Sequence, residues 1–525
     1  MSIEYDVAVV GYGPSGEVTA STIGGAGHRV AVFERHEVAY PLPRLGHIDG
    51  ETCRTIQATG TDVDHALRNA SPIASLNFGD AEEDPLISLD WSTRECGFDA
   101  HYAVFQPDFE AHLQECVAGM TNVDVFRGTE VVGLEQYDDH VQLTVRPKGS
   151  TDEADHRTVR VRYVVGADGT NSVVRQLAGI TMRDYGMHER WINYDMNKLV
   201  ELPDQYRDKA MMVMDPKRPR MYMPLGGNRY RFEARVDDSE TDEEMLAPGK
   251  VWEFLEEHHG LGSQELSVCR QAVYHYHTRV ADRWRNGRVF IVGDAAHTMP
   301  PYMGQGGCSA MRDARNIGWK LALVLDGAAG ESLLDEYQTE REPHVSTLVF
   351  VSHELAKMVN ITDRALAEER NAKLRSPLTA PLPNFPKLEH GVLHREADGT
   401  IAAVTGSLSP QGRLRSADRE GRGDDVLGHN LQLISRRTPD LSDKQRELLD
   451  SIGCAVAVLD DPTDPNAVED IEGVYHDFLT KHDVDAYITR PDWYVFGVAQ
   501  AVDLPALVDE LGHLLKATAG SVASY

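Results

Sequence analysis

Hydrophobic and polar positions follow a recognisable order at the start of the chain. Residues 5–10 (YDVAVV) form a short apolar run rich in β-branched residues, a glycine-rich turn follows, and small residues continue to about Gly25. A second apolar run ends at Glu34. This order predicts a strand, a tight turn, a helix and a second strand. Further on, Pro107 and the residues after it predict a helix with proline in its first turn.

The pattern changes character in the middle of the chain. Alternating runs at 131–134 and 141–145, and an apolar run that ends at Gly169, predict three more strands. Between residues 181 and 288, tryptophan, tyrosine and methionine become more frequent and strand-like pieces such as WINYDM, RMYMPL and RYRFEARV recur, which predicts an inserted sheet. The buried-strand pattern returns in NGRVFIVGD, and a long helix is predicted over about 308–325.

Prolines mark the boundary of a separate C-terminal unit. The segment 373–390 carries four prolines among polar residues, which is typical of a linker. From 391 to 525, strand patterns alternate with helical ones, which predicts a small α/β domain. The rest of the chain is predicted to form one nucleotide-binding domain from residues 1–180 and 289–372, interrupted by the sheet of residues 181–288.

Composition and charge narrow the class of protein. A chain of 525 residues is long enough for two or three domains, and it has no apolar run near the roughly 18 residues that a membrane span needs. The formal net charge of −31 disfavours nucleic acid or an anionic membrane as a partner. The N-terminus runs straight into a strand pattern rather than a signal peptide, so we expect a cytoplasmic protein. The six cysteines form no CxxC pair, which argues against disulfides and a metal site.

The glycine turn has the spacing and the context of a dinucleotide site. It reads Gly11-Tyr12-Gly13-Pro14-Ser15-Gly16, lies between a predicted strand and a predicted helix, and is followed by an acidic residue, Glu34, at the end of the next strand. The first glycine permits the turn, the second lets the backbone approach a pyrophosphate, and the third allows close helix packing. Glu34 can accept hydrogen bonds from a ribose. The turn alone does not distinguish FAD from NAD.

Two later segments select FAD by resemblance. GADGTNSVVR at 166–175 and GDAAHTMPPYMGQGG, which starts at Gly293, follow the turn in an order that resembles the single-component flavoprotein aromatic hydroxylases, the para-hydroxybenzoate hydroxylase-like family, over residues 1 to about 360. The resemblance implies an α/β fold: a glutathione reductase-type FAD-binding Rossmann domain with an inserted substrate-binding β-sheet. The C-terminal unit resembles the thioredoxin-like domain appended to many of these enzymes, although Cys454 stands without a second cysteine. A homodimer is expected.

The resemblance also assigns cofactor residues. Asp294 matches the aspartate that binds the ribityl chain of FAD, Pro301 and the 304–306 turn match the segment against the flavin ring, and Asp168 matches a motif associated with both FAD and NAD(P)H. Arg35 and Arg44 match arginines near the adenosine and phosphates, and Gln106 matches a polar side chain near the flavin. The full set implied is Gly11, Gly13, Pro14, Ser15, Gly16, Glu34, Arg35, Arg44, Gln106, Val131, Asp168, Asp294, Pro301, Gly304, Gln305 and Gly306.

The segment 43–60 carries the first candidates for the substrate side. It resembles the corresponding loop and helix of phenol hydroxylase and 3-(3-hydroxyphenyl)propionate hydroxylase, which implies a catalytic role for Asp49 and a place for His47 near the substrate hydroxyl. A base there would share the proton of the phenol and so raise the electron density of the ring. Asp49 is equally suited to cap the helix predicted after it, and His47 could be a loop residue without a proton role.

The inserted sheet offers further candidates. Tyr194 and Tyr222 are substrate candidates together with Pro301, and Tyr222 is also a catalytic candidate. Buried tyrosines of a sheet are more often core residues. Arginines at 220, 229 and 231 could grip a substrate carboxylate, or they could lie on a solvated strand edge.

The function implied is hydroxylation of a phenolic ring. FAD, reduced by NADPH or NADH, would react with O2 to form a flavin C4a-hydroperoxide in a water-poor pocket and transfer oxygen ortho to an existing hydroxyl of a small aromatic substrate. Two alternatives stay open. The same scaffold could oxidise a polyphenol or polyketide by hydroxylation or Baeyer-Villiger insertion, or the chain could be a flavin-binding redox sensor without turnover.

Overall fold

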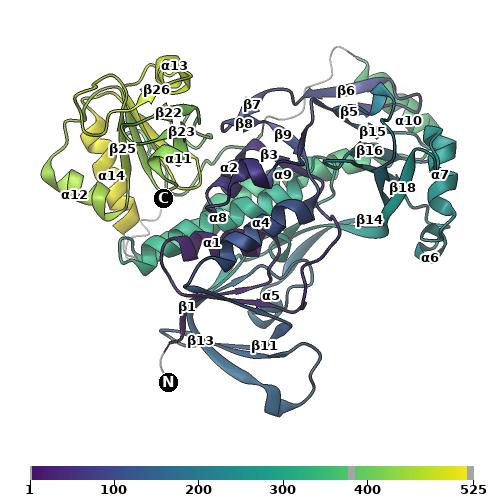
Figure 1. Ribbon diagram of the computed structural model, residues 1–525, viewed down its shortest axis with the longest axis horizontal. Coiled ribbons are helices and arrows are strands. Elements are labelled where there is room, and N and C mark those ends of the chain that lie inside the picture. The colour runs from purple at the N-terminus through teal and green to yellow at the C-terminus, as the bar shows by residue number, and fades with distance from the viewer. Residues whose placement is uncertain (1–2, 377–384, 517–525) are drawn as a thin grey trace.

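The computed structural model describes residues 3–376 and 385–516. They form three lobes: the N-terminal lobe at the bottom of Figure 1, a sheet lobe on the right and the C-terminal lobe on the left. The predicted linker 373–390 lies partly outside the described residues, and the helix before it, α10 (Arg364–Leu374), reaches into its first positions. Among the described residues, no helix has the length and apolar character needed to cross a membrane.

The N-terminal lobe is built on a mixed sheet around β1 (Tyr5–Val10). Parallel pairing joins β1 to β2 (Val30–Glu34) and to β13 (Arg157–Gly166), so the carboxyl ends of these strands meet at one edge. The glycine turn leads from β1 into α1 (Pro14–Gly25), which confirms the predicted strand, turn, helix and strand. The other strands of this sheet are β10 (Val123–Arg127), β12 (Val141–Pro147), β11 (Thr129–Gln136), β20 (Val289–Ile291) and β19 (Arg285–Asn286).

Two glycines of the turn are required by close backbone contacts. Gly11 has φ +99°, and a Cβ there would lie 2.4 Å from the carbonyl oxygen of Ala167. A Cβ on Gly16 would lie 2.1 Å from the carbonyl oxygen of Gly11. Gly13 differs, because it has an ordinary φ of −96° and a Cβ there would meet no protein atom within 4 Å. The space beside Gly13 belongs to a cavity rather than to the protein interior.

The sheet lobe contains the predicted inserted strands, and it also recruits earlier ones. Its strands run in the order β21 (His297–Thr298), β18 (Leu266–Ala281), β14 (Met182–Lys198), β17 (Arg229–Arg235), β16 (Arg220–Pro224), β15 (Lys209–Val213), β5 (Ser75–Gly79) and β6 (Pro85–Asp90). The sheet is therefore larger than the segment 181–288, because long-range pairing of β15 with β5 brings in residues of the first segment.

Alternation along the strands gives this sheet two different faces. On β14, Ile192, Tyr194 and Met196 pack in the cluster that includes Phe254 of α7 (Lys250–His259), at the back of the sheet. Trp191 points the other way and packs with Tyr302, which precedes α8 (Gln305–Leu325). The face that carries Trp191 is therefore the one that meets the N-terminal lobe, and we call it the flavin face.

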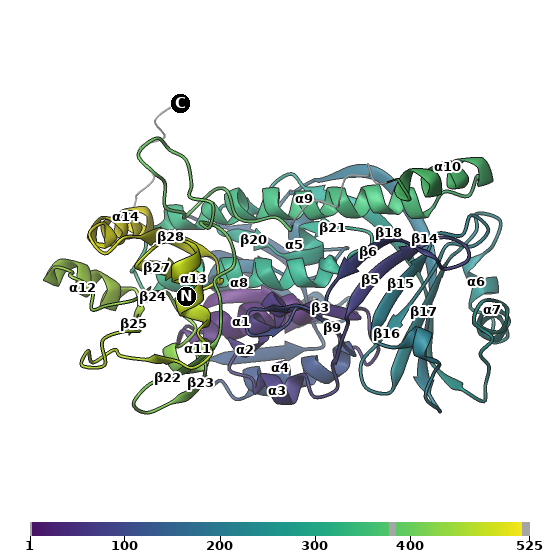
Figure 2. The same ribbon diagram turned by 90° about the horizontal axis from the view of Figure 1, so that it is seen from above.

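The long helices connect the three lobes. Figure 2 shows α8 and α9 (Glu336–Val359) running between the C-terminal lobe and the sheet lobe, and α8 begins at Gln305, slightly earlier than predicted. The helix predicted at Pro107 is α4 (Gln106–Ala118). The C-terminal lobe has the sheet order β25 (Ala455–Val458), β24 (Gln432–Ser435), β27 (Ala486–Thr489) and β28 (Val495–Ala499), with α11 (Gly423–Leu427), α12 (Asp443–Ser451), α13 (Val474–Lys481) and α14 (Leu504–Lys516).

A buried charge cluster joins α8, α9 and the C-terminal lobe. Glu340 of α9 accepts from Lys320 Nζ of α8 at 2.5 Å and from both terminal nitrogens of Arg490 at 2.8 and 2.6 Å. Arg490 also donates to Asp492 at 2.6 Å. The side chains of Lys320, Glu340 and Arg490 have no exposed surface. Glu340 is thus a carboxylate that two buried cations share.

Replacing Glu340 by alanine should destabilise the folded chain strongly. Glu340→Ala leaves Lys320 and Arg490 buried beside each other, and breaking a buried pair in this way costs about 3–5 kcal/mol. Glu354→Ala on the same helix is the matched control, because its partner Lys357 is exposed and exposed pairs contribute below about 1 kcal/mol. Unfolding of both variants in denaturant checks this, and equal midpoints would contradict it.

Replacing Gly13 by valine should remove the cofactor but keep the fold. The backbone at Gly13 suits any residue and a Cβ there meets no protein atom, so the new side chain projects into the space where the pyrophosphate of FAD is expected. We expect Gly13→Val to keep its circular dichroism spectrum and to be purified without flavin absorbance. Gly25→Ala is the control, because a Cβ at Gly25 is also free of contacts but lies at the far end of α1. Full FAD occupancy in Gly13→Val would refute the expected position of the pyrophosphate.

Candidate active site

A cavity of about 660 Å³ opens at the carboxyl ends of β1, β2 and β13. The bare backbone beside Gly13 borders it, so a phosphate can approach there, and the first turn of α1 offers unpaired N–H groups. The residues present therefore fit a dinucleotide such as FAD. Of the predicted cofactor residues, the cavity is lined by Gly11, Gly13, Pro14, Glu34, Arg35, Arg44, Gln106, Val131 and Asp168.

Several of these side chains also hold the walls of the cavity. Glu34 accepts from the backbone N–H of Tyr12 at 3.0 Å and of His36 at 2.7 Å, which fixes the end of β2 against the turn. Gln106 Oε1 accepts from the backbone N–H of Arg44 at 2.9 Å and of Leu45 at 2.7 Å. Gln106 therefore positions the loop that carries Arg44 toward the cavity.

The two predicted aspartates differ in how much of the carboxylate is free. Asp168 accepts from the backbone N–H groups of Val173 at 2.7 Å and Val174 at 3.1 Å, and from the Ser172 hydroxyl, so it caps α5 (Val173–Leu177). Asp294 has one weak contact, from the Thr170 hydroxyl at 3.3 Å, and its side chain is accessible. The surrounding protein raises its pKa. An accessible carboxylate of this kind can accept hydrogen bonds from a polyol chain.

The start of α8 comes close to the 43–49 segment. Gly304 has φ +65° and is the residue before the helix, and a Cβ there would lie 2.6 Å from His47 Nδ1. Its N–H donates to the Pro301 carbonyl at 2.8 Å, which closes a turn over residues 301–304, and the predicted 304–306 segment runs from there into the first residues of α8. Gly306 faces open space, with nothing closer than 3.9 Å to a Cβ. The 21-residue helix directs its positive end at this point, a suitable environment for a flavin that becomes anionic on reduction. Ser15 and Gly16 lie in the first turn of α1, outside this second group.

Asp49 is a helix cap and one half of a buried ion pair. It accepts from the backbone N–H of Thr52 at 2.9 Å, which caps α2 (Gly50–Gln57), and from Gln305 Nε2 at 3.2 Å. It also pairs with Arg312 of α8, which pairs with Glu51 at 2.5 Å. Burial opposes its ionisation, but the Arg312 guanidinium, the neighbouring His47 and the hydrogen bonds from Thr52 together outweigh burial and hold the pKa of Asp49 below its usual value. Of the two roles considered for Asp49, the contacts support capping, and a carboxylate held in this state is a poor base.

His47 lies in the expected segment, and its ring forms a hydrogen-bonded pair with the ring of His101. Its Nδ1 lies 3.2 Å from the Gly304 carbonyl, which can only accept, so this nitrogen carries the hydrogen. Its Nε2 lies 2.9 Å from His101 Nδ1 and must then accept from it. His101 Nε2 is left as the acceptor of the pair. Burial lowers the pKa of both rings, that of His101 to about 3, so both are neutral at neutral pH.

His101 lines a second cavity, of about 350 Å³, next to the start of α8. The indole of Trp91 stacks on His101 with ring centroids 3.9 Å apart and also lines this cavity. Met303, Leu348 and other apolar side chains complete much of the wall, and no lysine or arginine is among the described residues that line it. The cavity has the size and surface expected for a single aromatic ring.

The structure corrects the two tyrosine candidates. Tyr194 and Tyr222 have no exposed surface and lie in the cluster at the back of the sheet, away from the flavin face. Tyr222 donates to Glu83 at 2.8 Å, and burial followed by that carboxylate raises its pKa. Side-chain alternation explains the error, because a one-residue shift along a strand moves a side chain to the opposite face. The observed positions match the core alternative.

The three arginine candidates are engaged within the protein. Arg231 lies on the flavin face and binds Asp195 through two bonds of 2.7 and 3.1 Å. Arg220 pairs with Asp215 at 3.0 Å, and Arg229 lies 3.5 Å from Asp108. No free arginine of this sheet is therefore available at these positions for a substrate carboxylate.

Arg312, His101 and Trp91 were missed at the sequence level. The helix pattern around Arg312 places charged residues on a helix that turns out to be buried, which was the available signal. No role was assigned to His101 or Trp91 from the sequence, and only the fold brings them to His47.

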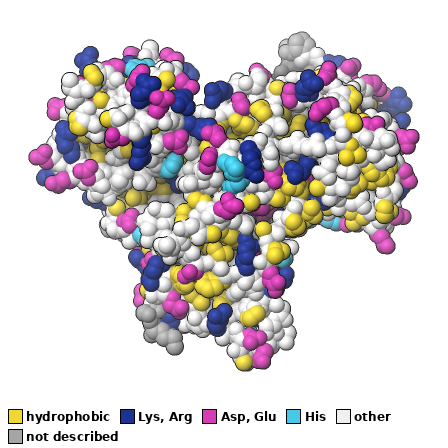
Figure 3. Space-filling model, viewed as in Figure 1, with side chains coloured by type: hydrophobic (Ala, Val, Ile, Leu, Met, Phe, Trp, Pro, Cys, Tyr) yellow, Lys and Arg dark blue, Asp and Glu magenta, His cyan; other side chains and the backbone are white. Residues whose placement is uncertain are grey.

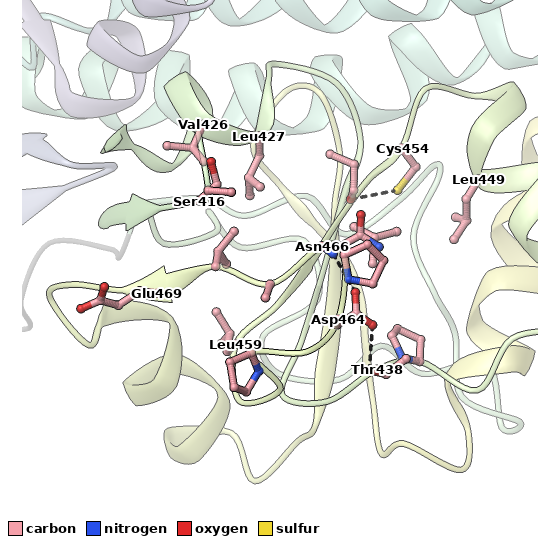
Figure 4. Close-up of a pocket in the computed structure, with 18 of the residues that line it drawn as sticks. Ser416, Val426, Leu427, Thr438, Leu449, Cys454, Leu459, Asp464, Asn466 and Glu469 are labelled. Atoms are coloured by element: carbon pink, nitrogen blue, oxygen red, sulfur yellow. Dashed lines mark hydrogen bonds between the residues drawn. The ribbon is translucent and has the colours of Figure 1, made fainter. Parts of the chain in front are cut away.

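A larger cavity, of about 960 Å³, lies in the C-terminal lobe and contains none of the predicted residues. Figure 4 shows Cys454, Leu449 and Leu459 on its wall together with Asp464 and Glu469. Burial raises the pKa of Cys454 to about 12, so its thiol is unreactive. Figure 3 shows acidic and basic side chains mixed over all three lobes on the face of Figure 1.

Comparison with known proteins agrees with the geometry. The model of a family described as FAD binding domain matches residues 4–352, and that of the HcaD C-terminal domain matches residues 406–514. A protein of Rhodococcus jostii (strain RHA1) named "Probable NADH-specific resorcinol 4-hydroxylase" is 34% identical over 96% of this chain and 94% of its own. The 3-(3-hydroxy-phenyl)propionate/3-hydroxycinnamic acid hydroxylase of Mycobacterium sp. (strain JLS) is 31% identical over 98% of this chain and 93% of its own.

Solved structures show the same fold. The flavin-dependent monooxygenase PieE, in complex with FAD and substrate, has a TM-score of 0.79 at 20% identity and covers 98% of this chain and 100% of its own. Aklavinone-11 hydroxylase with FAD and aklavinone has a TM-score of 0.74 at 20% identity, with 97% and 99% covered. The chain therefore belongs to the FAD binding domain family and is a single-component, FAD-dependent aromatic monooxygenase.

Proposed function

We propose that this enzyme hydroxylates a small phenol at the carbon ortho to an existing hydroxyl group, with NADH as the reductant. The observation that carries the proposal is the 350 Å³ cavity beside the start of α8, which joins an apolar wall to the neutral acceptor His101, with Ser88, Asp90, Gln305 and Thr347 as its other polar lining residues. The resorcinol hydroxylase name of one relative supports the substrate class, and its NADH-specific name supports the reductant. The small volume favours one ring over a polyketide.

Different residues of the chain would bind the cofactor and the substrate. FAD, when bound and reduced, takes up O2 and supplies the electrophilic oxygen atom. Gly11, Gly13, Asp294 and the 304–306 turn would hold the cofactor. The neutral His101 accepts a hydrogen bond from the phenol hydroxyl, while His47 holds His101 in the right tautomer. Sharing this proton raises the electron density of the ring at the ortho carbon.

The C-terminal lobe would act through packing rather than redox chemistry. Its four-stranded sheet flanked by helices supports the thioredoxin-like arrangement expected from the sequence. Cys454 has no second cysteine beside it and its thiol stays protonated because it is buried. The contacts of Arg490 with Glu340 support a structural role.

A panel of phenols tests the proposed function directly. We expect the FAD-loaded enzyme to consume NADH faster when a small phenol is present and to release a product heavier by one oxygen atom, with little hydrogen peroxide. NADPH should support this poorly. A product with oxygen inserted into a ring, or flavin reduction that no phenol stimulates, would overturn the proposal.

Removing the acceptor should uncouple the reaction. In His101→Leu, we expect NADH oxidation to continue while the product formed per NADH falls at least about tenfold, because the substrate hydroxyl loses its partner. His101→Asn keeps an acceptor and should recover part of the yield. His140→Leu, on the distant hairpin between β11 and β12, is the control.

Since burial lowers the pKa of His101 to about 3, histidine protonation should not reduce the yield between pH 8 and pH 6. Unchanged coupling in His101→Leu would rule this role out.

A further inference from the structure

One carboxylate on the flavin face has no hydrogen-bond partner among the described residues. Glu233 of β17 is only 3% exposed, and its nearest cation is Arg231 Nε at 3.7 Å. Buried carboxylates normally accept several hydrogen bonds, because an unpaired buried charge is costly. Arg231 does not serve this need, because it binds Asp195 and the backbone carbonyls of Pro43 and Arg44.

The neighbours of Glu233 on the same face also have unused polar atoms. Asn193, directly across the strand pair from Glu233, is 1% exposed and its Oδ1 has no hydrogen-bond partner in the described structure. The indole N–H of Trp191, one position further along this face of β14, is likewise buried without a partner. Three unsatisfied polar groups in one patch indicate a place for a ligand rather than a packed core.

This patch is connected to the aromatic cavity through the packing of Trp191, and its own residues lie outside the lining of that cavity. Trp191 meets the ring of Tyr302 edge to face, with centroids 5.9 Å apart, and Tyr302 directly follows Pro301 of the segment expected against the flavin. Trp91 and Met303, which line the 350 Å³ cavity, pack in the same apolar cluster as Trp191. The unsatisfied groups therefore lie on the sheet side of the proposed substrate site.

We propose that Glu233 and Asn193 form a substrate subsite that accepts hydrogen bonds from a second hydroxyl group, so that the enzyme takes neutral dihydroxybenzenes and rejects aromatic acids. This inference rests on the proposed function. A carboxylate accepts strongly from a phenol hydroxyl. It repels a substrate carboxylate, and the nearby Arg231 and Arg270 already bind Asp195 and the Pro43 carbonyl.

The charge state of Glu233 gives the subsite a characteristic pH dependence. Burial raises the pKa of Glu233 to about 7, Arg231 on its own strand and Arg270 on β18 oppose this, and Asp195 on β14 adds to it. Tyr276 of β18 and Tyr302 also face it, and both stay neutral because burial raises the pKa of each. Since the ionised form of Glu233 is the better acceptor, affinity for a neutral dihydroxybenzene should rise from pH 6 to pH 8. Affinity for an aromatic acid should fall over the same range.

Titration of the FAD-loaded enzyme through the flavin absorbance tests the subsite. Resorcinol and 3-(3-hydroxyphenyl)propionate are the two probes, each at pH 6 and pH 8. At pH 8, we expect the natural chain to bind resorcinol at least about tenfold more tightly than it binds 3-(3-hydroxyphenyl)propionate. This ratio is roughly the contribution of one charge-assisted hydrogen bond. Glu233→Gln should reduce this preference to within about threefold and remove its pH dependence. Glu243→Gln, on α6 (Asp242–Met245) behind the sheet, should behave like the natural chain.

The outcomes separate the subsite from the reaction itself. Equal or tighter binding of the propionate by the natural chain, or an unchanged preference in Glu233→Gln with full FAD content, would overturn the subsite. If some phenol still stimulates NADH oxidation and gains one oxygen atom, the proposed function stands and only the subsite fails. If no phenol does so, the proposed function fails, whatever the binding data show.

Discussion

The buried ion pairs of α8 are the interaction on which the rest of the structure depends. Arg312 binds Asp49 and Glu51, which connects α8 to the segment that carries His47. Further along the helix, Asp313 accepts from His297 at 2.7 Å and from Arg341 at 2.9 Å, and Lys320 shares Glu340 with Arg490. Each pair reaches a different part of the chain, so α8 is a common frame for the flavin segment, α9 and the C-terminal lobe.

This arrangement explains how a lobe without redox chemistry can affect the active site. The first residue of α8 follows Gly304, which contacts His47, and the far end of the same helix is held through Arg490. Because a helix is rigid along its axis, the position of its N-terminus depends on what holds the remainder. Arg54 of α2 also binds Asp424 of the C-terminal lobe through bonds of 2.7 and 2.9 Å. The C-terminal lobe thus supports both sides of the site.

The sequence predicted what is encoded locally and missed what depends on distant pairing. The glycine turn, α4 and the strands around it follow from short-range patterns and were expected correctly. Asp49 was ambiguous because its partner Arg312 lies 263 residues away, and only the fold brings them together. Tyr222 was misplaced for another reason: alternation shows that residues 221 and 222 lie on opposite faces, but not which face meets the flavin. The pairing of β5 with β15 could not be predicted either, because these strands, like Asp49 and Arg312, lie far apart in the sequence.

The buried charges of the protein fall into two groups, those paired with an opposite charge and those left free to bind a ligand. Asp49, Asp313 and Glu340 are buried, and each is matched by a cation, which is what the cost of burying charge requires. Glu233 is buried without a hydrogen bond, and His101 Nε2 is a neutral acceptor on the wall of a cavity. Both groups accept and neither donates in these states, so the site is matched only by a ligand that brings its own hydrogens. A ring with two hydroxyl groups is the ligand that we propose for these acceptors, and the pairing of the other charges is what leaves these two available.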